Sequence, residues 1–248
     1  MSRKGLVWSR ARVERDWALL PPEGVAESVL PEWEGTASKI LAAPAMGAGF
    51  AQYDLTIATD GGTQQALPEH VEAFLFVHAG KVRCDVNGSG QTFEPGGFTY
   101  MRPGSRFMVH ADTDAKLTWL KKRYVPFGGG RPWDVFGNER EMPGETYMGF
   151  EGLILKTLLP VDPAFDMAMN IFTFPLGASL PVIETHVMEH GLVMLQGQGV
   201  YYLGREWMEV QAGDFIWMGP YVPQSFYATG GEPARYLYYK DVHRDVTL

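Results

Sequence analysis

The hydrophobic residues of this chain fall into many short runs, separated by clusters of glycine, proline and aspartate. Runs of about four to eight residues rich in Val, Ile, Phe, Tyr and Trp are typical of β-strands. Sustained helical periodicity is scarce, and the 29 glycines and 17 prolines punctuate the runs as turns between strands require. The pattern therefore predicts an all-β protein built as a sandwich or barrel.

The pattern of strands and turns occurs twice along the chain. Two β-rich runs, each broken by a glycine turn, align when Gly80 is placed opposite Gly197. A second glycine turn follows in each copy and pairs Gly97 with Gly213. The offsets are 117 and 116 residues, which predicts a tandem duplication of a domain of somewhat more than about 100 residues.

The connection between the two copies is expected at residues 128–150, which contain a triple glycine, prolines and charged residues. We place the boundary near residue 140, which gives an N-terminal domain over residues 1–140 and a C-terminal domain over residues 141–248. The first fifty residues are expected to form lead-in strands that pack across the other copy.

Composition and charge narrow the classes of function. The net charge of −8 and the pI of about 5.3 provide no general attraction to nucleic acid or to anionic membranes. The single cysteine, Cys84, cannot form an intrachain disulfide, fits a reducing compartment and is expected to be a buried, inert thiol. The apolar run at residues 5–8 is too short for a signal peptide, and no segment approaches the length of a membrane span. We expect a cytoplasmic protein.

Candidate metal ligands lie in the window Glu184-Thr185-His186-Val187-Met188-Glu189-His190. On an extended strand Glu184 and His186 leave the same face, and His190 keeps that parity if the chain turns back only after it. One carboxylate and two imidazoles suit Mn, Fe, Ni or Zn better than Ca or Mg. Glu189 has the opposite parity and is expected to point away from the metal into solvent.

A strand near the C-terminus carries the second group of candidates. Tyr236, Tyr238 and Lys240 share one face, so the lysine enters the barrel if that strand lines it. A buried ammonium group pairs with an anion or reaches the rim, and a substrate carboxylate would be such an anion. Tyr201 and the other tyrosines could equally be core aromatics.

The glycines and ligands together resemble the motifs of the cupin superfamily, small β-barrels that hold a metal. The first motif matches Gly177, the three candidate ligands and Gly197, and the second leads from Gly213 to Gln224, eleven positions later. Two features depart from the usual pattern. Pro220 stands one place late, and the ligand set would be Glu, His, His and Gln rather than three histidines and a glutamate. The resemblance implies a tandem cupin, or bicupin, with two jelly-roll (double-stranded β-helix) barrels.

The runs IETHVMEHG, LQGQGVYYL and ARYLYYKDVHRDVTL narrow the resemblance to the bicupin (S)-ureidoglycine aminohydrolases of purine (allantoin) catabolism, over most of the chain. The family implies a manganese ion, although other divalent transition metals are chemically possible. The residues that the resemblance assigns to manganese are Glu184, His186, His190 and Gln224. Those that it assigns to the substrate are Tyr201, Tyr236 and Lys240.

The N-terminal copy lacks this ligand set. With Gly80 placed over Gly197, Leu67, Glu69 and Ala73 stand where the first three ligands lie, and eleven positions after Gly97 is Met108. The face that carries Phe74 and other bulky groups is expected to be packed core. We therefore interpret this copy as structural and without metal.

The resulting hypothesis is manganese-dependent hydrolysis of (S)-ureidoglycine to (S)-ureidoglycolate and ammonia. Lys240 would neutralise the substrate carboxylate, Tyr201 and Tyr236 would hydrogen-bond the ureido or amine groups, and Glu184 would serve as ligand and proton acceptor. Direct addition of water and prior loss of ammonia through an imine-like intermediate both stay open. The alternatives are a metal-dependent cupin oxygenase or isomerase acting on another small carboxylate, and a non-catalytic small-molecule-binding cupin. Sheet edges and the apolar N-terminal segment favour a homo-oligomer.

Overall fold

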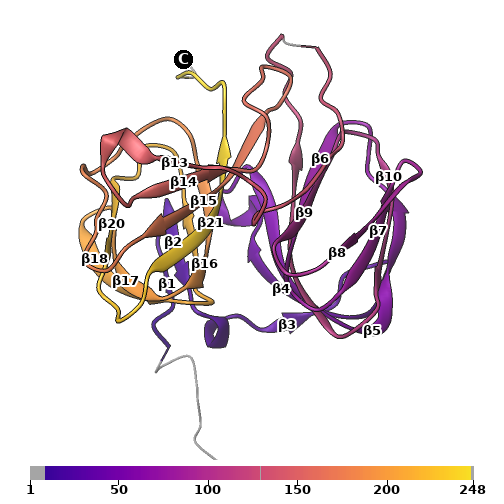
Figure 1. Ribbon diagram of the computed structural model, residues 1–248, viewed down its shortest axis with the longest axis horizontal. Helices are drawn as coiled ribbons and strands as arrows, with labels where there is room; N and C mark the ends of the chain where they lie inside the picture. The colour runs from indigo at the N-terminus through magenta and orange to yellow at the C-terminus, as the bar shows by residue number, and fades with distance from the viewer. Residues whose placement is uncertain (1–8, 129, 247–248) are drawn as a thin grey trace, which may run out of the picture.

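The computed structural model describes residues 9–128 and 130–246, and it consists of two β-barrels that lie side by side (Figure 1). The predicted all-β architecture with two successive barrels is confirmed. Residues 5–8, on which the argument against a signal peptide rests, lie outside the described residues. No helix in the described part of the chain is long and apolar enough to cross a membrane.

The first barrel is formed by a ten-stranded sheet. Its longest strand, β5 (Phe50–Ala66), pairs with β11 (Ala115–Arg123) through its first half and with β10 (Arg106–Ala111) through its second half, so one strand serves both walls. The other strands are β3 (Glu27–Ser28), β4 (Trp33–Ala42), β6 (Val71–Ala79), β7 (Val82–Val86), β8 (Ser89–Phe93), β9 (Gly97–Met101) and β12 (Val135–Asn138).

The second barrel combines an eight-stranded sheet, in the order β1-β2-β19-β16-β21-β15-β14-β13, with a three-stranded sheet, in the order β18-β17-β20. Short 3-10 helices occur at Pro22–Gly24, Pro44–Met46 and Tyr147–Gly149. The strands are β1 (Arg12–Val13), β2 (Trp17–Leu20), β13 (Gly144–Thr146), β14 (Ile154–Thr157), β15 (Met167–Phe174), β16 (His190–Gln196), β17 (Gln198–Leu203), β18 (Glu206–Gln211), β19 (Phe215–Met218), β20 (Gln224–Ala228) and β21 (Ala234–Asp241).

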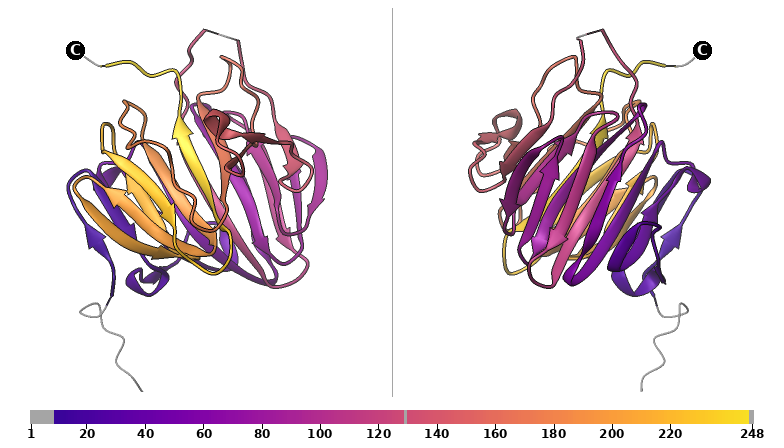
Figure 2. Two further views of the ribbon diagram at one scale, coloured as in Figure 1. Left: turned by 60° about the vertical axis from the view of Figure 1, so that its left-hand side comes forward. Right: turned by 90° about the vertical axis from the view of Figure 1, so that its right-hand side faces the viewer.

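The N-terminal strands cross from one barrel to the other (Figure 2). All four residues of β2 are buried, and β2 pairs with β19 of the second barrel. This pairing agrees with the expectation that lead-in strands pack across the other copy. β3 and β4 instead belong to the sheet of the first barrel, so the expectation is wrong for the second half of this segment. The chain leaves the first sheet after Asn138 and enters the second at Gly144.

The glycine turns locate the repeat more accurately than the sequence alignment does. Gly80 and Gly197 have φ of 83° and 72°, a left-handed conformation that favours glycine. At the second turn Gly213 has φ of 93°, and the matching residue is Gly96, at 94°, rather than Gly97. The offset is therefore 117 residues at both turns, and Phe107, not Met108, occupies the position of Gln224 in the first barrel.

Three apolar cores hold the molecule together. One fills each barrel, and the third lies between the barrels and includes Phe74 and Phe76, Phe165 and Tyr239. Cys84 is buried in the first barrel, and burial raises the pKa of its thiol to about 12. Both facts support an inert structural cysteine.

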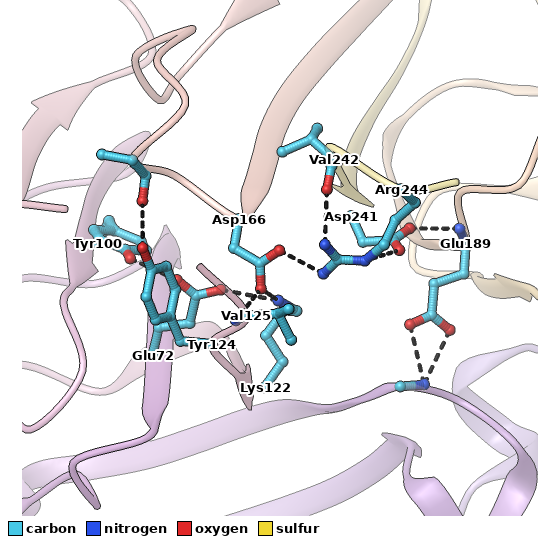
Figure 3. A network of polar contacts seen from close by, with 12 residues as sticks. Glu72, Tyr100, Lys122, Tyr124, Val125, Asp166, Glu189, Asp241, Val242 and Arg244 are labelled. Carbon is cyan, nitrogen blue, oxygen red and sulfur yellow. Dashed lines mark hydrogen bonds and ion pairs between the residues drawn. The ribbon is translucent and has the colours of Figure 1, made fainter. Parts of the chain in front are cut away.

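A network of charged side chains accompanies the apolar core between the barrels (Figure 3). Lys122 of β11 contacts Glu72 at 3.1 Å and also pairs with Asp166 of the second domain; the three side chains are 4%, 0% and 1% exposed. Arg244 joins Asp166 to Asp241, whose Oδ1 accepts a hydrogen bond of 2.6 Å from the backbone N–H of Glu189. The network therefore ends beside the candidate ligand His190.

Glu189 provides a second link between the barrels. Both of its carboxylate oxygens lie 3.0 Å from the backbone nitrogen of Gly49, which donates to them. A Cβ atom at position 49 would come within 2.4 Å of this carboxylate, so a larger residue would displace the Glu189 side chain from this close approach. The Trp217 Nε1–H donates to the same carboxylate at 3.4 Å.

The Lys122→Met variant tests the energetic weight of the charged network. Removal of the ammonium group leaves two buried carboxylates without their shared partner, which costs about 3–5 kcal/mol of unfolding free energy. Urea denaturation at neutral pH measures the loss. The matched control, exposed Lys81→Met, should change the unfolding free energy by less than about 0.5 kcal/mol. Equal stability of the two variants would contradict the prediction.

Candidate metal centre

The segment that carries the candidate ligands is a loop rather than the predicted extended strand. Glu184 forms an isolated β-bridge with Gln224, with N–H···O distances of 2.8 and 2.9 Å, and only His190 belongs to a strand, at the start of β16. Between them, the Thr185 hydroxyl donates to the Tyr221 carbonyl, and the Tyr221 N–H donates to the His186 carbonyl. Contacts with the segment around Tyr221 and Gln224 thus hold this loop in place. The prediction that Glu184, His186 and His190 share one face of an extended strand is wrong, because the segment is not a strand.

The two histidines nevertheless face each other. His186 Nε2 lies 3.2 Å from His190 Nε2, and the rings are nearly perpendicular. His190 is 6% exposed and is positioned by its pairing with Met218 of β19 and Lys240 of β21. The loop and the strand therefore bring the imidazoles together by different routes.

The hydrogen bonds define which nitrogen of each ring is free. His186 Nδ1 lies 3.0 Å from the Met188 carbonyl, and His190 Nδ1 lies 3.0 Å from the Tyr239 carbonyl. A carbonyl oxygen only accepts, so each Nδ1 carries the proton and each neutral ring has its lone pair on Nε2. Such a backbone partner on the second nitrogen is typical of histidines that bind metals.

The electrostatics favour neutral rings. Burial, followed by the neighbouring charge of His186, lowers the pKa of His190 to about 3. Burial and the Lys240 ammonium group lower the pKa of His186. Two lone pairs that face each other in a place where protonation is unfavourable are well suited to a divalent cation.

The amide of Gln224 completes this side of the site. Its Nε2 lies 3.3 Å from His186 Nε2, and its Oε1 accepts a hydrogen bond of 3.1 Å from the Tyr201 hydroxyl. A half-turn of the Gln224 amide group would direct its oxygen at His186 and its nitrogen at Tyr201. The Tyr201 hydroxyl could then accept a hydrogen bond from the amide nitrogen, because a hydroxyl both donates and accepts. Gln224 therefore fits a role as an oxygen ligand.

The carboxylate of Glu184 has a different partner. Its Oε1 accepts a hydrogen bond of 2.8 Å from the hydroxyl of Tyr147. Burial, followed by this contact, raises the pKa of Tyr147 to about 12. In this arrangement no group of three His, Cys, Asp or Glu side chains in the described residues is close enough to enclose a metal. The four candidate ligands are chemically suited to a metal. Glu184 is the one whose carboxylate is not grouped with the two histidines.

All seven predicted site residues line one cavity of about 150 Å³. Tyr236, Tyr238 and Lys240 of β21 enter it together, as their shared parity predicts. The volume is below the roughly 300–1,000 Å³ of pockets for drug-sized ligands, so the cavity suits a small molecule. The residues around it are Tyr147, Phe172, Leu180, Glu184, His186, His190, Leu192, Tyr201, Met218, Gln224, Tyr236, Tyr238 and Lys240.

Lys240 brings an ammonium group to this cavity. Its side chain is partly buried, and no carboxylate among the described residues lies within the 4.0 Å of an ion pair with its ammonium group. The hydroxyls of Tyr201 and Tyr236 lie in the same cavity, and burial raises the pKa of both. The site therefore presents one positive charge and protonated hydroxyl groups to a ligand.

Two features of the site differ from the sequence-based expectations. Glu189 points away from the cavity, as expected, but it is 6% exposed rather than solvated, because it is enclosed by Gly49 and Trp217. Tyr147 lies in the segment that we interpreted only as a connection. The aromatic residues of TYMGF within that polar stretch are the signal that could have identified it.

The corresponding positions of the first barrel are filled by its own core. Leu67, Ala73 and Phe107 stand where Glu184, His190 and Gln224 lie, and all three belong to the apolar cluster inside that barrel. Glu69, at the position of His186, is exposed. Apolar side chains occupy the space in which the second barrel forms its cavity.

The barrel architecture and the two turns that carry the candidate ligands are those of a cupin, and residues 170–239 match the family model described as a cupin domain. The chain is 40% identical to the (S)-ureidoglycine aminohydrolase of Escherichia coli (strain K12), with 99% of this chain and 96% of that protein covered. It is 34% identical to the (S)-ureidoglycine aminohydrolase of Arabidopsis thaliana, over 96% of this chain and 80% of that protein. The chain belongs to the (S)-ureidoglycine aminohydrolase family of cupins.

A solved structure is similar over the whole molecule. The crystal structure of protein Ylba from E. coli superposes with a TM-score of 0.88 at 38% identity, and 100% of each chain is covered. The family placement favours a hydrolase over the alternatives of an oxygenase, an isomerase or a non-catalytic binding protein.

The His186→Ala variant tests the candidate ligands. Loss of one of the two facing Nε2 atoms should reduce the divalent metal that copurifies with the protein to background, because the remaining donors do not converge without it. Elemental analysis of purified protein measures metal per chain. His110→Ala, on β10 of the first barrel, is the matched control and should retain the wild-type metal content. Stoichiometric metal in His186→Ala would show that the ligands are other residues.

Proposed function

We propose that this protein hydrolyses (S)-ureidoglycine to (S)-ureidoglycolate and ammonia with a manganese ion held by Glu184, His186, His190 and Gln224. The observation that most supports the proposal is the position of Lys240, an ammonium group that has no carboxylate partner among the described residues and lies in a small cavity beside these four residues. The E. coli and Arabidopsis relatives are named (S)-ureidoglycine aminohydrolases, which supports this substrate and the hydrolysis of its amine.

The substrate matches the groups that line the cavity. Its carboxylate is an anion that Lys240 would neutralise, and a charge-assisted hydrogen bond in a partly buried site is stronger than its counterpart in water. Tyr201 and Tyr236 are buried hydroxyl donors suited to the ureido and amine groups. The overall charge of −8 does not oppose capture, because the local field of the site determines binding.

The reaction replaces one bond at the carbon that carries the amine. The C–N bond to the amine breaks, a C–O bond to the oxygen of water forms, and the proton lost by water is accounted for in the ammonia released. A bound divalent ion would supply Lewis acidity and fix the carboxylate together with a neighbouring heteroatom. Glu184 would accept a proton while Lys240 and the tyrosines hold the substrate in one orientation. Water addition and an imine-like intermediate are both compatible with these roles.

Manganese is the proposed ion because the family resemblance implies it, and the donor set is compatible with this metal. One carboxylate oxygen, one amide oxygen and two imidazole nitrogens form a mixed site in which oxygen ligands match the preference of Mn²⁺. Two neutral histidines distinguish it from the oxygen-only sites that Ca²⁺ and Mg²⁺ prefer.

A direct assay tests the activity. Purified protein that contains manganese is incubated with ureidoglycine generated freshly from allantoate, and ammonia and the chirality of the ureidoglycolate are followed. We expect ammonia release well above the spontaneous rate and a product that is the S enantiomer. A rate equal to the spontaneous background, with metal shown to be bound, would refute the proposed activity.

The Lys240→Met variant tests the recognition of the carboxylate. The variant should retain its metal, while kcat/KM falls about 10- to 150-fold, the equivalent of the 1.5–3 kcal/mol that a hydrogen bond to a charged group contributes. Lys121→Met, in β11 of the first barrel, provides the control and should leave the kinetics unchanged. Wild-type kinetics in Lys240→Met would show that this lysine does not bind the substrate carboxylate.

A further inference from the structure

The connection between the barrels contributes one side chain to the active-site cavity. Tyr147 is partly buried, while all other residues from 143 to 150 are exposed. Its ring packs edge-on against Phe172 of β15, with centroids 4.8 Å apart and planes at 88°. The side chain lines the cavity with the candidate ligands and the substrate-binding residues.

Several interactions hold this part of the connection in place. Upstream, Glu139 pairs with Arg235 at 2.8 Å and with Lys156 at 3.4 Å, which fixes the chain to the second sheet as it leaves the first. Residues 144–146 then form β13, which pairs with β14. The Tyr147 N–H donates to the Leu153 carbonyl at 2.9 Å. The position of Tyr147 is therefore determined by the sheet beneath it.

A tight turn directs the tyrosine inward. The Phe150 N–H donates to the Tyr147 carbonyl at 3.0 Å, and Met148 and Gly149 have φ of 49° and 77°. A left-handed conformation is uncommon for a residue such as methionine and persists where the surrounding structure requires it. The side chains of Met148 and Phe150 are exposed, and of the residues in this turn only Tyr147 lines the cavity.

The hydroxyl of Tyr147 is aimed at one oxygen of Glu184. It donates to Oε1 at 2.8 Å, and Oε2 has no hydrogen-bond partner among the described residues. The four proposed ligands differ in this respect. Backbone carbonyls orient His186 and His190, and Tyr201 orients Gln224, so Glu184 is the ligand whose orienting partner comes from the connection between the barrels.

We propose that Tyr147 is a positioning residue for Glu184: its hydroxyl holds one carboxylate oxygen and leaves the other for the metal. This inference rests on the metal site of the proposed function and adds a residue from the connection to it. Hydrogen-bond partners of metal ligands typically contribute about 10- to 100-fold to metal affinity or activity. The same contact limits the rotation of Glu184 when it accepts a proton from water.

The Tyr147→Phe variant tests this role through metal binding, without substrate. It removes the hydroxyl and keeps the ring against Phe172, so metal-free protein should retain the wild-type unfolding temperature. The dissociation constant for Mn²⁺, from calorimetric titration or the spin-resonance signal of free Mn²⁺, should rise about 10- to 100-fold. Tyr202→Phe is the matched control, since its ring lies on the opposite face of β17 against Trp207, and it should bind Mn²⁺ as the wild type does.

The outcomes separate this inference from the proposed activity. A dissociation constant in Tyr147→Phe within about twofold of the wild type would overturn the inference, even if ureidoglycine is hydrolysed. A selective loss of Mn²⁺ affinity in Tyr147→Phe supports it, even if the wild-type protein turns out to act on another substrate. Wild-type protein that binds no Mn²⁺ would overturn both the proposed metal site and the inference.

Discussion

The structure depends on the alternation of side chains along β21. This strand lies between β15 and β16, so its register is fixed by hydrogen bonds on both sides. Tyr236, Tyr238 and Lys240 face the cavity, whereas Leu237 and Tyr239 pack into the core between the barrels. A slip of one residue would place the lysine in that core and the interface residues in the cavity. One strand thus determines both the lining of the candidate site and the contact between the domains.

The two barrels of the duplicated fold have different roles. In the second barrel, backbone pairing of Glu184 with Gln224 joins two loops, and the strand pairing of β16 adds His190, so donors from separate parts of the chain line one cavity. In the first barrel, apolar residues fill the equivalent positions. That barrel instead provides Gly49 and Lys122, whose contacts with Glu189 and Asp166 anchor the segments next to His190 and Lys240.

The sequence predicts those features that depend on local periodicity. The duplication, the shared face of Tyr236, Tyr238 and Lys240, and the burial of Cys84 all follow from spacing or from residue type. Features that depend on contacts between distant segments could not be predicted in this way. Glu189 is buried by Gly49, 140 positions away, and Tyr147 reaches Glu184 from a stretch whose glycines and prolines indicate only a connection. The parity argument for residues 184–190 assumes an extended strand, whereas a loop carries His186; the two histidines face each other because the opposite loop and β16 position them.

The proposed metal site places a single ion in the second barrel and none in the first. Anomalous diffraction at the manganese edge, from crystals grown with Mn²⁺, tests it most directly. We expect one anomalous peak per chain, next to the Nε2 atoms of His186 and His190 and within reach of the oxygens of Glu184 and Gln224. A peak inside the first barrel, or the absence of any peak between the two histidines, would contradict it.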